Sequence, residues 1–150
     1  MAKAPNPQPV IEALSRLLAD SYTLYLKSHN YHWNVTGPMF TSLHTLFELQ
    51  YTELAAAIDE IAERIRALGA RAPASFSEFA AISTVREDTG SPKATAMVKN
   101  LVNDQQSMVL SARALIAAAE AAGDQASVDL GTRRTEVHQK NAWMLRSHLE

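Results

Sequence analysis

The sequence predicts an all-α protein: a four-helix bundle with a short extra helix in the connection between the second and third long helices. Two observations lead to this prediction. Glycine and proline, which interrupt helices, cluster at a few points and leave long tracts almost free of both. Within those tracts apolar residues recur every three or four positions, as on a helix with one buried face, and no stretch alternates as a strand does. Four helices of roughly 25 to 30 residues are about 35 to 45 Å long, which suits an elongated bundle.

The first two long helices are expected over residues 9–34 and 38–69. Pro38 can begin a helix because its missing N–H has no helical partner in the first turn, and Gly69 is a typical residue for a helix end. The first helix carries a core stripe at three- and four-residue intervals, made of Ile11, Leu14, Leu18, Tyr22 and Tyr25.

The next two helices have recognisable N-terminal signals. Ser75 and Glu78 have the S-x-x-E spacing of a capping box, and the apolar residues that follow predict a short helix. Ser91 is a suitable N-cap with Pro92 at the first helical position. The third long helix should therefore run from there until Gly123 ends it.

The fourth long helix should begin at a cap formed by Asp124 or Ser127 and reach nearly to the C-terminus. Gly131, in its first turns, weakens this prediction because glycine is a poor helix former. We expect one helical domain over residues 9–150, preceded by a disordered, proline-rich tail over residues 1–8.

The composition excludes several kinds of function. Without cysteine there are no disulfides, thiolate metal sites or cysteine nucleophiles, which leaves His, Asp and Glu as possible metal ligands. Fourteen basic and sixteen acidic residues give a formal net charge of −2, which offers no electrostatic reason to hold a polyanion. The longest apolar stretch, residues 114–119, is far short of a membrane span, and the N-terminus lacks an apolar signal region. We therefore expect a soluble, cytoplasmic protein.

The second helix places its polar and apolar residues on two different faces. At about 100° per residue and with His44 at zero, Glu48 falls near 40°, Asp59 near 60° and Glu63 near 100°. These four side chains lie within one quadrant and point away from the core. The apolar stripe lies between roughly 200° and 320° and consists of Leu46, Phe47, Leu54, Ala57, Ile58, Ile61, Ile65 and Leu68.

The four polar residues form two pairs that can each converge on one cation. His44 and Glu48 are four residues apart, as are Asp59 and Glu63, and histidine with carboxylates suits iron(II), manganese(II) or zinc. The two pairs lie about 22 Å apart along the helix axis, too far to share a metal within one chain. A second copy of the helix, antiparallel across a two-fold axis, would bring each pair opposite the other and create two equivalent sites per dimer.

Other interpretations of these residues remain open. The polar residues on the outward face of the second helix could equally form an ordinary solvated surface. No Glu-x-x-His motif occurs in the sequence, and its absence argues against a di-iron site inside one bundle. The other histidines and the tryptophans have structural interpretations: a hydrogen-bonded core or interface position for His29 and His32, a surface position for His138 and His148, and core or interface packing for Trp33 and Trp143.

A combination of motifs within residues 32–69 carries a family resemblance. His-Trp-Asn at 32–34 is followed by Val-Thr-Gly-Pro-Met-Phe, by a second histidine twelve residues after the first, and by Asp-x-x-x-Glu-Arg and Leu-Gly. This combination resembles the signature of the Dps family of mini-ferritins at matching spacings, and the resemblance extends over nearly the whole chain. It implies the ferritin-like form of the four-helix bundle.

The resemblance also implies which residues bind metal. His32 and His44 of one subunit, with Asp59 and Glu63 of another, match the family's inter-subunit ferroxidase ligands, so the resemblance adds His32 to the set. Glu48 departs from the pattern because many relatives carry Asp there; the longer side chain keeps the charge but can alter the second metal position.

The implied activity is that of a ferroxidase. Such a protein binds iron(II) at the dimer interface, oxidises it with hydrogen peroxide or dioxygen, and stores ferric mineral in a cage of twelve subunits built from two-fold dimers. The family's three-fold iron-entry pores are lined by an acidic segment that Gly123-Asp124 and Asp129 resemble, although a helix cap explains Asp124 equally well.

Two rival functions are considered. The first is a nucleoid protein that coats DNA, which in relatives often depends on a mobile tail rich in Lys and Arg. Here the first ten residues hold only Lys3 and the chain ends with the last helix, so we expect DNA binding to be weak. The second is a helical bundle without metal chemistry.

Overall fold

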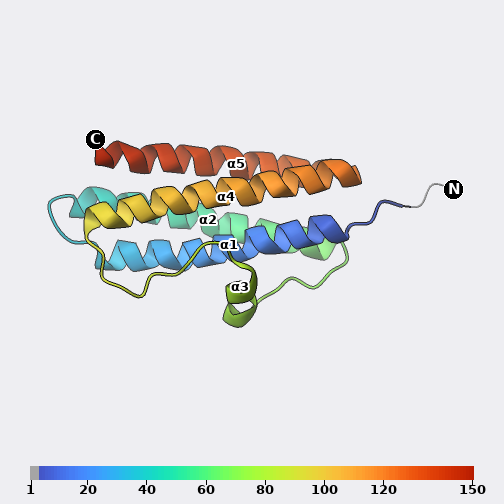
Figure 1. Cartoon of the computed structure of the whole chain (residues 1–150), viewed down its shortest axis with the longest axis horizontal. Helices are drawn as coiled ribbons and strands as arrows, with labels where there is room; N and C mark the ends of the chain where they lie inside the picture. Colours follow the sequence, from blue (N-terminus) through green and yellow to red (C-terminus); the bar gives the residue numbers. More distant parts are fainter. Residues whose placement is uncertain (1–3) are drawn as a thin grey trace.

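The computed structural model describes residues 4–150, and its regular elements are all helical (Figure 1). The α-helices are α1 (Gln8–Asn34), α2 (Phe40–Ala67), α3 (Phe76–Ile82), α4 (Ala94–Ala122) and α5 (Gln125–Arg146), followed by a 3₁₀ turn, η1 (Ser147–Leu149). The predicted all-α class and the short helix between the second and third long helices are confirmed.

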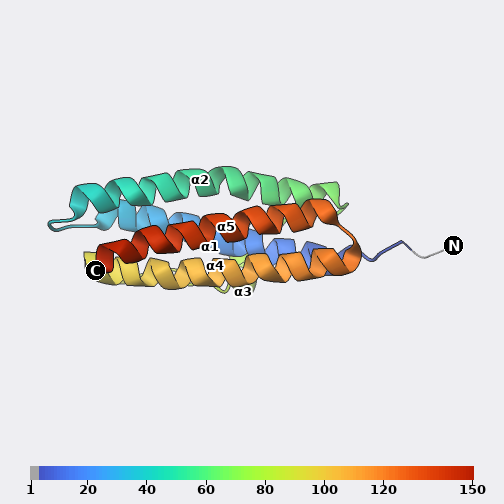
Figure 2. The ribbon, with the colours of Figure 1, turned by 90° about the horizontal axis from the view of Figure 1, so that it is seen from above.

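The four long helices lie side by side in one elongated bundle (Figures 1 and 2). Short turns make α1 and α2 one antiparallel pair and α4 and α5 another. The connection from α2 to α4 instead crosses the length of the bundle over α1, and α3, which lies within this connection, packs against α1 on the outside of the four long helices (Figure 1). One long crossover of this kind is the connectivity of ferritin-like bundles.

Two helices begin later than the sequence predicts. Gly37 has φ +102°, a backbone conformation that favours glycine, and Pro38 belongs to the turn that it starts, so α2 begins only at Phe40. Lys93 is extended, with ψ 163°, so α4 begins at Ala94, and neither Ser91 nor Pro92 belongs to it. The expected caps at Ser75 and Asp124 are present, since each side chain accepts a hydrogen bond from a backbone N–H in the first turn.

The core follows the predicted stripes. Of the eight apolar residues predicted on α2, six are buried, and Ile58 and Leu68 are half-buried against the core. Gly131 is buried between α4 and α5, where an added Cβ would lie 2.7 Å from Ile116 Cγ1 and 3.1 Å from the Ala112 carbonyl oxygen. The glycine that weakened the helix prediction therefore permits close packing of these two helices.

The surface position predicted for His138 is wrong, because its side chain is fully buried. Arg134 Nη2 lies 3.1 Å from His138 Nε2, and His138 Nδ1 lies 2.6 Å from Gln105 Oε1. Arginine only donates, so Nε2 accepts and Nδ1–H donates to Gln105. Burial, with the charge of Arg134, holds the pKa of His138 well below its usual value. A helical wheel could not reveal this position, because the partners come from α4 and α5 together.

The other aromatic and tail predictions have mixed outcomes. Trp33 and Trp143 are 64% and 60% exposed, so neither belongs to the core of this chain, and packing in an interface remains their predicted role. His148 is half-buried and its Nδ1 donates to the Met144 carbonyl.

Residues 4–7 have no regular structure, whereas Lys3 lies outside the described residues. No helix within 4–150 is long and apolar enough to cross a membrane.

Candidate metal centre

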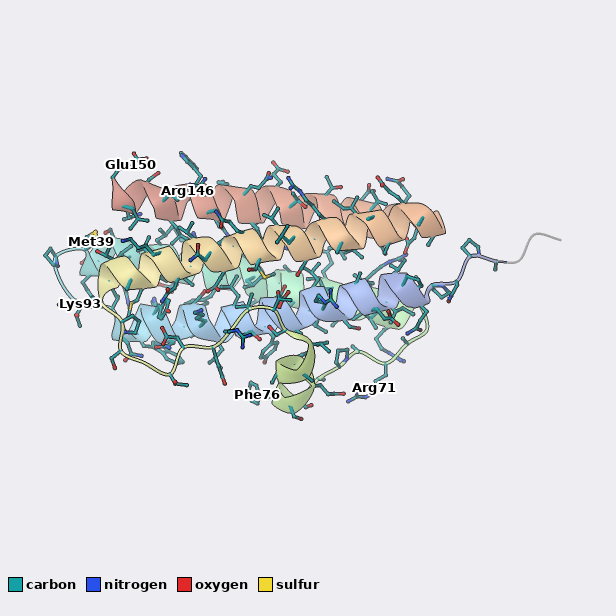
Figure 3. All side chains as sticks on the ribbon, viewed as in Figure 1. Met39, Arg71, Phe76, Lys93, Arg146 and Glu150 are labelled. Carbon is teal, nitrogen blue, oxygen red and sulfur yellow. The ribbon has the colours of Figure 1, made fainter. Side chains whose placement is uncertain are left out.

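The turn between α1 and α2 brings the two predicted histidine ligands together. His32 lies in the last turn of α1 and His44 in the second turn of α2, at the end of the bundle that also carries Met39 and Lys93 (Figure 3). Their imidazole rings are stacked, with centroids 3.7 Å apart and planes inclined by 12°. His32 is buried and His44 is half-buried, so the pair sits at the edge of the bundle and not in its core.

Each histidine is bonded to the backbone of the other. His32 Nδ1 lies 2.7 Å from the His44 carbonyl oxygen, and His44 Nδ1 lies 2.7 Å from the His32 carbonyl oxygen. A carbonyl oxygen only accepts, so both Nδ1 atoms carry the hydrogen, and in the neutral rings both Nε2 atoms keep a lone pair. Histidines that bind metals are commonly held in this way, by a hydrogen bond from the other ring nitrogen.

The stacking of the two rings determines how many metal ions they can bind. The lone pair of Nε2 lies in the plane of its ring, and two nearly parallel planes do not meet at a nearby metal ion. The rings are therefore suited to two separate ions. Their spacing of 3.7 Å is close to the separation of about 3.5 to 4 Å between the ions of two-metal sites.

Aromatic side chains enclose the histidine pair. Phe40 stacks on His44 at a centroid distance of 4.9 Å, and Tyr51 presents its edge to His32 at 5.3 Å. Tyr51 also contacts His29, with centroids 3.9 Å apart, and burial holds the pKa of His29 below its usual value. His29 is half-buried and does not belong to the core, so an interface position remains its predicted role. These ring contacts restrict the rotation of the imidazoles.

The three candidate carboxylates lie on the outer face of α2. Glu48, Asp59 and Glu63 are all exposed, and within the described chain none of them has a hydrogen bond or an ion pair to another side chain. Glu48 is one helical turn from His44. In residues 4–150 no three His, Asp or Glu side chains converge on one point, so a single chain does not assemble all five predicted ligands.

The residues compared with an acidic pore have different surroundings. Asp124 accepts hydrogen bonds from Ser127 N at 3.1 Å and Ser127 Oγ at 2.6 Å, and it pairs with Arg64 at 2.8 Å. These contacts support the interpretation of Asp124 as a helix cap. Asp129 is exposed and, with Glu63, lines a cavity of about 410 Å³ between α2 and α5.

Sequence reasoning missed the buried ion pair between α1 and α4. Lys27 forms an ion pair with Asp104 at 2.8 Å, and both side chains are buried between α1 and α4. Burial raises the pKa of Asp104, while Lys27 opposes this effect. The available signal was the presence of charged residues at helical spacing within apolar tracts of the first and third long helices.

Comparison with known proteins agrees with this architecture. Residues 11–150 match the family model described as a ferritin-like domain. The structure of Dps from Staphylococcus aureus superposes with a TM-score of 0.94 at 35% sequence identity, covering 98% of this chain and 99% of that one. The structure from Vibrio cholerae, described as a member of a broad superfamily of ferritin-like diiron-carboxylate proteins, gives 0.92 at 32% identity and covers 100% of this chain and 99% of that one. Fold and connectivity thus define a ferritin-like protein.

Similarity in sequence narrows the class. DNA protection during starvation protein 2 of Bacillus anthracis is 39% identical over 140 residues, which cover 93% of this chain and 96% of that protein. A low temperature-induced protein of Nostoc is 43% identical over 145 residues, 95% of this chain and 81% of that protein. The chain belongs to the Dps family within the ferritin-like superfamily.

Proposed function

We propose that this protein is a ferroxidase and iron-storage subunit that binds iron(II) at sites shared between two copies of the chain. The observation that carries the proposal is the stacked histidine pair, whose Nδ1 atoms are both bonded to backbone and whose Nε2 atoms both keep a lone pair. The description of the Vibrio cholerae relative as a diiron-carboxylate protein supports iron as the metal.

The ligand set combines two subunits. His32 and His44 of one chain would bind together with Asp59 and Glu63 of an antiparallel partner, because the two halves lie about 22 Å apart along α2 in a single chain. Glu48, next to His44, would complete the second metal position. The absence of partners for these carboxylates within residues 4–150 leaves them available to a metal.

Two adjacent ions suit the chemistry of peroxide. Imidazole and carboxylate ligands favour iron(III) over iron(II), because the more highly charged ion gains more from anionic oxygen. Two iron(II) ions each give one electron to hydrogen peroxide, whose O–O bond breaks. Two protons are taken up to form two water molecules: 2 Fe²⁺ + H₂O₂ + 2 H⁺ → 2 Fe³⁺ + 2 H₂O. Delivery of both electrons at one site avoids release of a hydroxyl radical. Dioxygen is the alternative oxidant, and the ferric product would be stored in a cage of twelve subunits.

DNA coating is the second candidate function. Its support is the name of the Bacillus anthracis relative, a DNA protection protein. The net charge of −2 opposes it, since phosphate contacts by Lys and Arg supply most non-specific affinity for DNA. We therefore propose iron oxidation as the primary activity.

Subunit mixing tests the shared site. The double variants His32→Ala/His44→Ala and Asp59→Ala/Glu63→Ala should each lose rapid iron oxidation, because every site then lacks half of its ligands. After dissociation and co-refolding, about half of the dimers should be mixed, and each mixed dimer regains one intact site of two. Roughly a quarter of wild-type initial rate should return.

The control mixes His32→Ala with His44→Ala, two variants damaged in the same half. Neither site of such a dimer regains all its ligands, so the rate should stay at that of the separate variants. Mixed dimers of the two double variants, demonstrated by mass spectrometry, that have no activity above either parent would contradict the shared site.

A further inference from the structure

The segment that leads from α3 to α4 is bonded to α1 at three successive points. We call residues 83–90 the strap; they follow α1 toward the end of the bundle where α4 begins (Figure 1). The three anchors on α1 are Asp20, Lys27 and the pair Asn30 and Tyr31, so the strap is fixed along the C-terminal half of this helix, which contains His32.

The first anchor is a fully buried carboxylate. Asp20 accepts hydrogen bonds from the backbone N–H groups of Thr84 and Val85, at 2.5 and 3.0 Å, and from the hydroxyls of Ser83, Thr84 and Ser111. Five donors satisfy both oxygens of this buried charge. The start of the strap is therefore held firmly to both α1 and α4.

The second anchor is Lys27. Its Nζ donates to the Arg86 carbonyl oxygen at 2.8 Å while it pairs with Asp104 on α4. The middle of the strap thus supplies one of the two acceptors that this buried ammonium group contacts.

The third anchor involves Tyr31, the residue next to His32 in the chain. Tyr31 OH donates to Asp88 Oδ2 at 2.5 Å, and Asn30 Nδ2 donates to the Asp88 carbonyl oxygen at 3.0 Å. The other carboxylate oxygen of Asp88 accepts from the Gly90 N–H at 2.8 Å, and Tyr31 OH accepts from Asn100 Nδ2 at 3.1 Å. Tyr31 is fully buried and precedes His32 in the chain, so the strap and α4 hold the residue next to a proposed ligand.

We propose that Asp88 is a positioning residue for His32, acting through Tyr31. The last turn of a helix lacks some of its backbone partners and frays easily, and here it must hold an imidazole in register with His44. A roll of α1 by about 10° would move a ring nitrogen some 6.5 Å from the helix axis by roughly 1 Å. Displacements of that size exceed the tolerance of about 0.5 Å for a preorganised site. The hydroxyl-to-carboxylate bond opposes this roll.

Cobalt(II) binding tests this role without iron turnover. This inference rests on the proposed metal site, so His32→Ala serves as the reference for a lost ligand. Tyr31→Phe keeps the ring in the core and removes only the hydroxyl, and Asp88→Ala removes its acceptor. Each should weaken cobalt affinity at the site by about 3- to 10-fold and change the visible absorption of the bound ion, and the double variant should be no worse than either single one.

A stability-matched control separates positioning from general destabilisation. Ala119→Gly weakens α4 near its C-terminal end, at the opposite end of the bundle from His32, and should leave cobalt affinity and spectrum unchanged at a comparable loss of Tm. Affinity within twofold of wild type in Tyr31→Phe and Asp88→Ala, or an equal loss in Ala119→Gly, would overturn the inference while leaving the shared site intact. Wild-type cobalt binding in His32→Ala would instead overturn the proposed site itself.

Discussion

The tautomers of His32 and His44 are set by the backbone of the helix that faces each of them. The reciprocal bonds to carbonyl oxygens engage Nδ1 and leave both Nε2 lone pairs free, and the near-parallel stacking keeps those lone pairs in separate planes. The two residues are therefore not interchangeable copies of one ligand; each has its own direction of approach to a metal.

Stoichiometry distinguishes separate ions from one shared ion. Wild-type protein should bind about two cobalt(II) ions per subunit at the shared sites, and His32→Ala and His44→Ala should each retain about one. The ion that remains should differ in its absorption spectrum between the two variants. Calorimetric titration counts the ions; loss of the same single ion in both variants would mean that the rings share it.

His138 makes stability depend on pH. Its pKa in the folded protein lies well below the usual value of 6.5, so the unfolded chain takes up a proton at a pH where the folded one does not. This contribution to stability is present above the usual pKa of 6.5 and is lost progressively as pH falls below it, toward the lower pKa of the folded protein. Denaturant unfolding at pH 7.5 and 5.5 should show a smaller loss of stability on acidification in His138→Gln than in the wild-type protein. Equal sensitivity in the two proteins would assign the effect to other groups.

At the scale of elements, the close contact between α4 and α5 depends on the absence of a side chain at Gly131. Alanine at position 131 has the better helix propensity by about 1 kcal/mol, but its Cβ would meet Ile116 and the Ala112 carbonyl. Gly131→Ala should therefore lower the free energy of unfolding by about 1 to 3 kcal/mol, measured by urea denaturation. The additional change Ile116→Ala removes the closest contact, and a double-mutant cycle should show a favourable coupling between the two. A more stable Gly131→Ala would disprove the steric argument.

The accuracy of sequence reasoning also differs between elements. Helical periodicity and caps predict the existence and most ends of the long helices, because these depend on residues close in sequence. The starts of α2 and α4 were misplaced since a positive φ at Gly37 and an extended Lys93 decide them. The outward face of α2 was predictable from the wheel, whereas the stacking of His32 on His44 depends on how a turn closes. The burial of His138 depends on partners in two helices and was likewise out of reach.

At the scale of the whole molecule, charge sets the expected response to DNA. Subunits with a net charge of −2 should bind duplex DNA weakly at physiological salt, because few phosphate contacts are available to release counterions. A gel shift at 0.02 M salt that disappears at about 0.15 M and neutral pH is the expected result. A complex stable at the higher salt concentration would restore DNA coating as a primary function.

The two exposed tryptophans give the assembly an intrinsic optical reporter. Trp33 is the neighbour of His32 on α1, whereas Trp143 lies on α5, and the chain has no others. A partner that supplies carboxylates to His32 and also covers the exposed Trp33 would transfer its indole from water to a less polar environment and shift its emission to shorter wavelengths. In a Trp143→Phe background, fluorescence would therefore follow the formation of the shared interface in real time, without an attached dye.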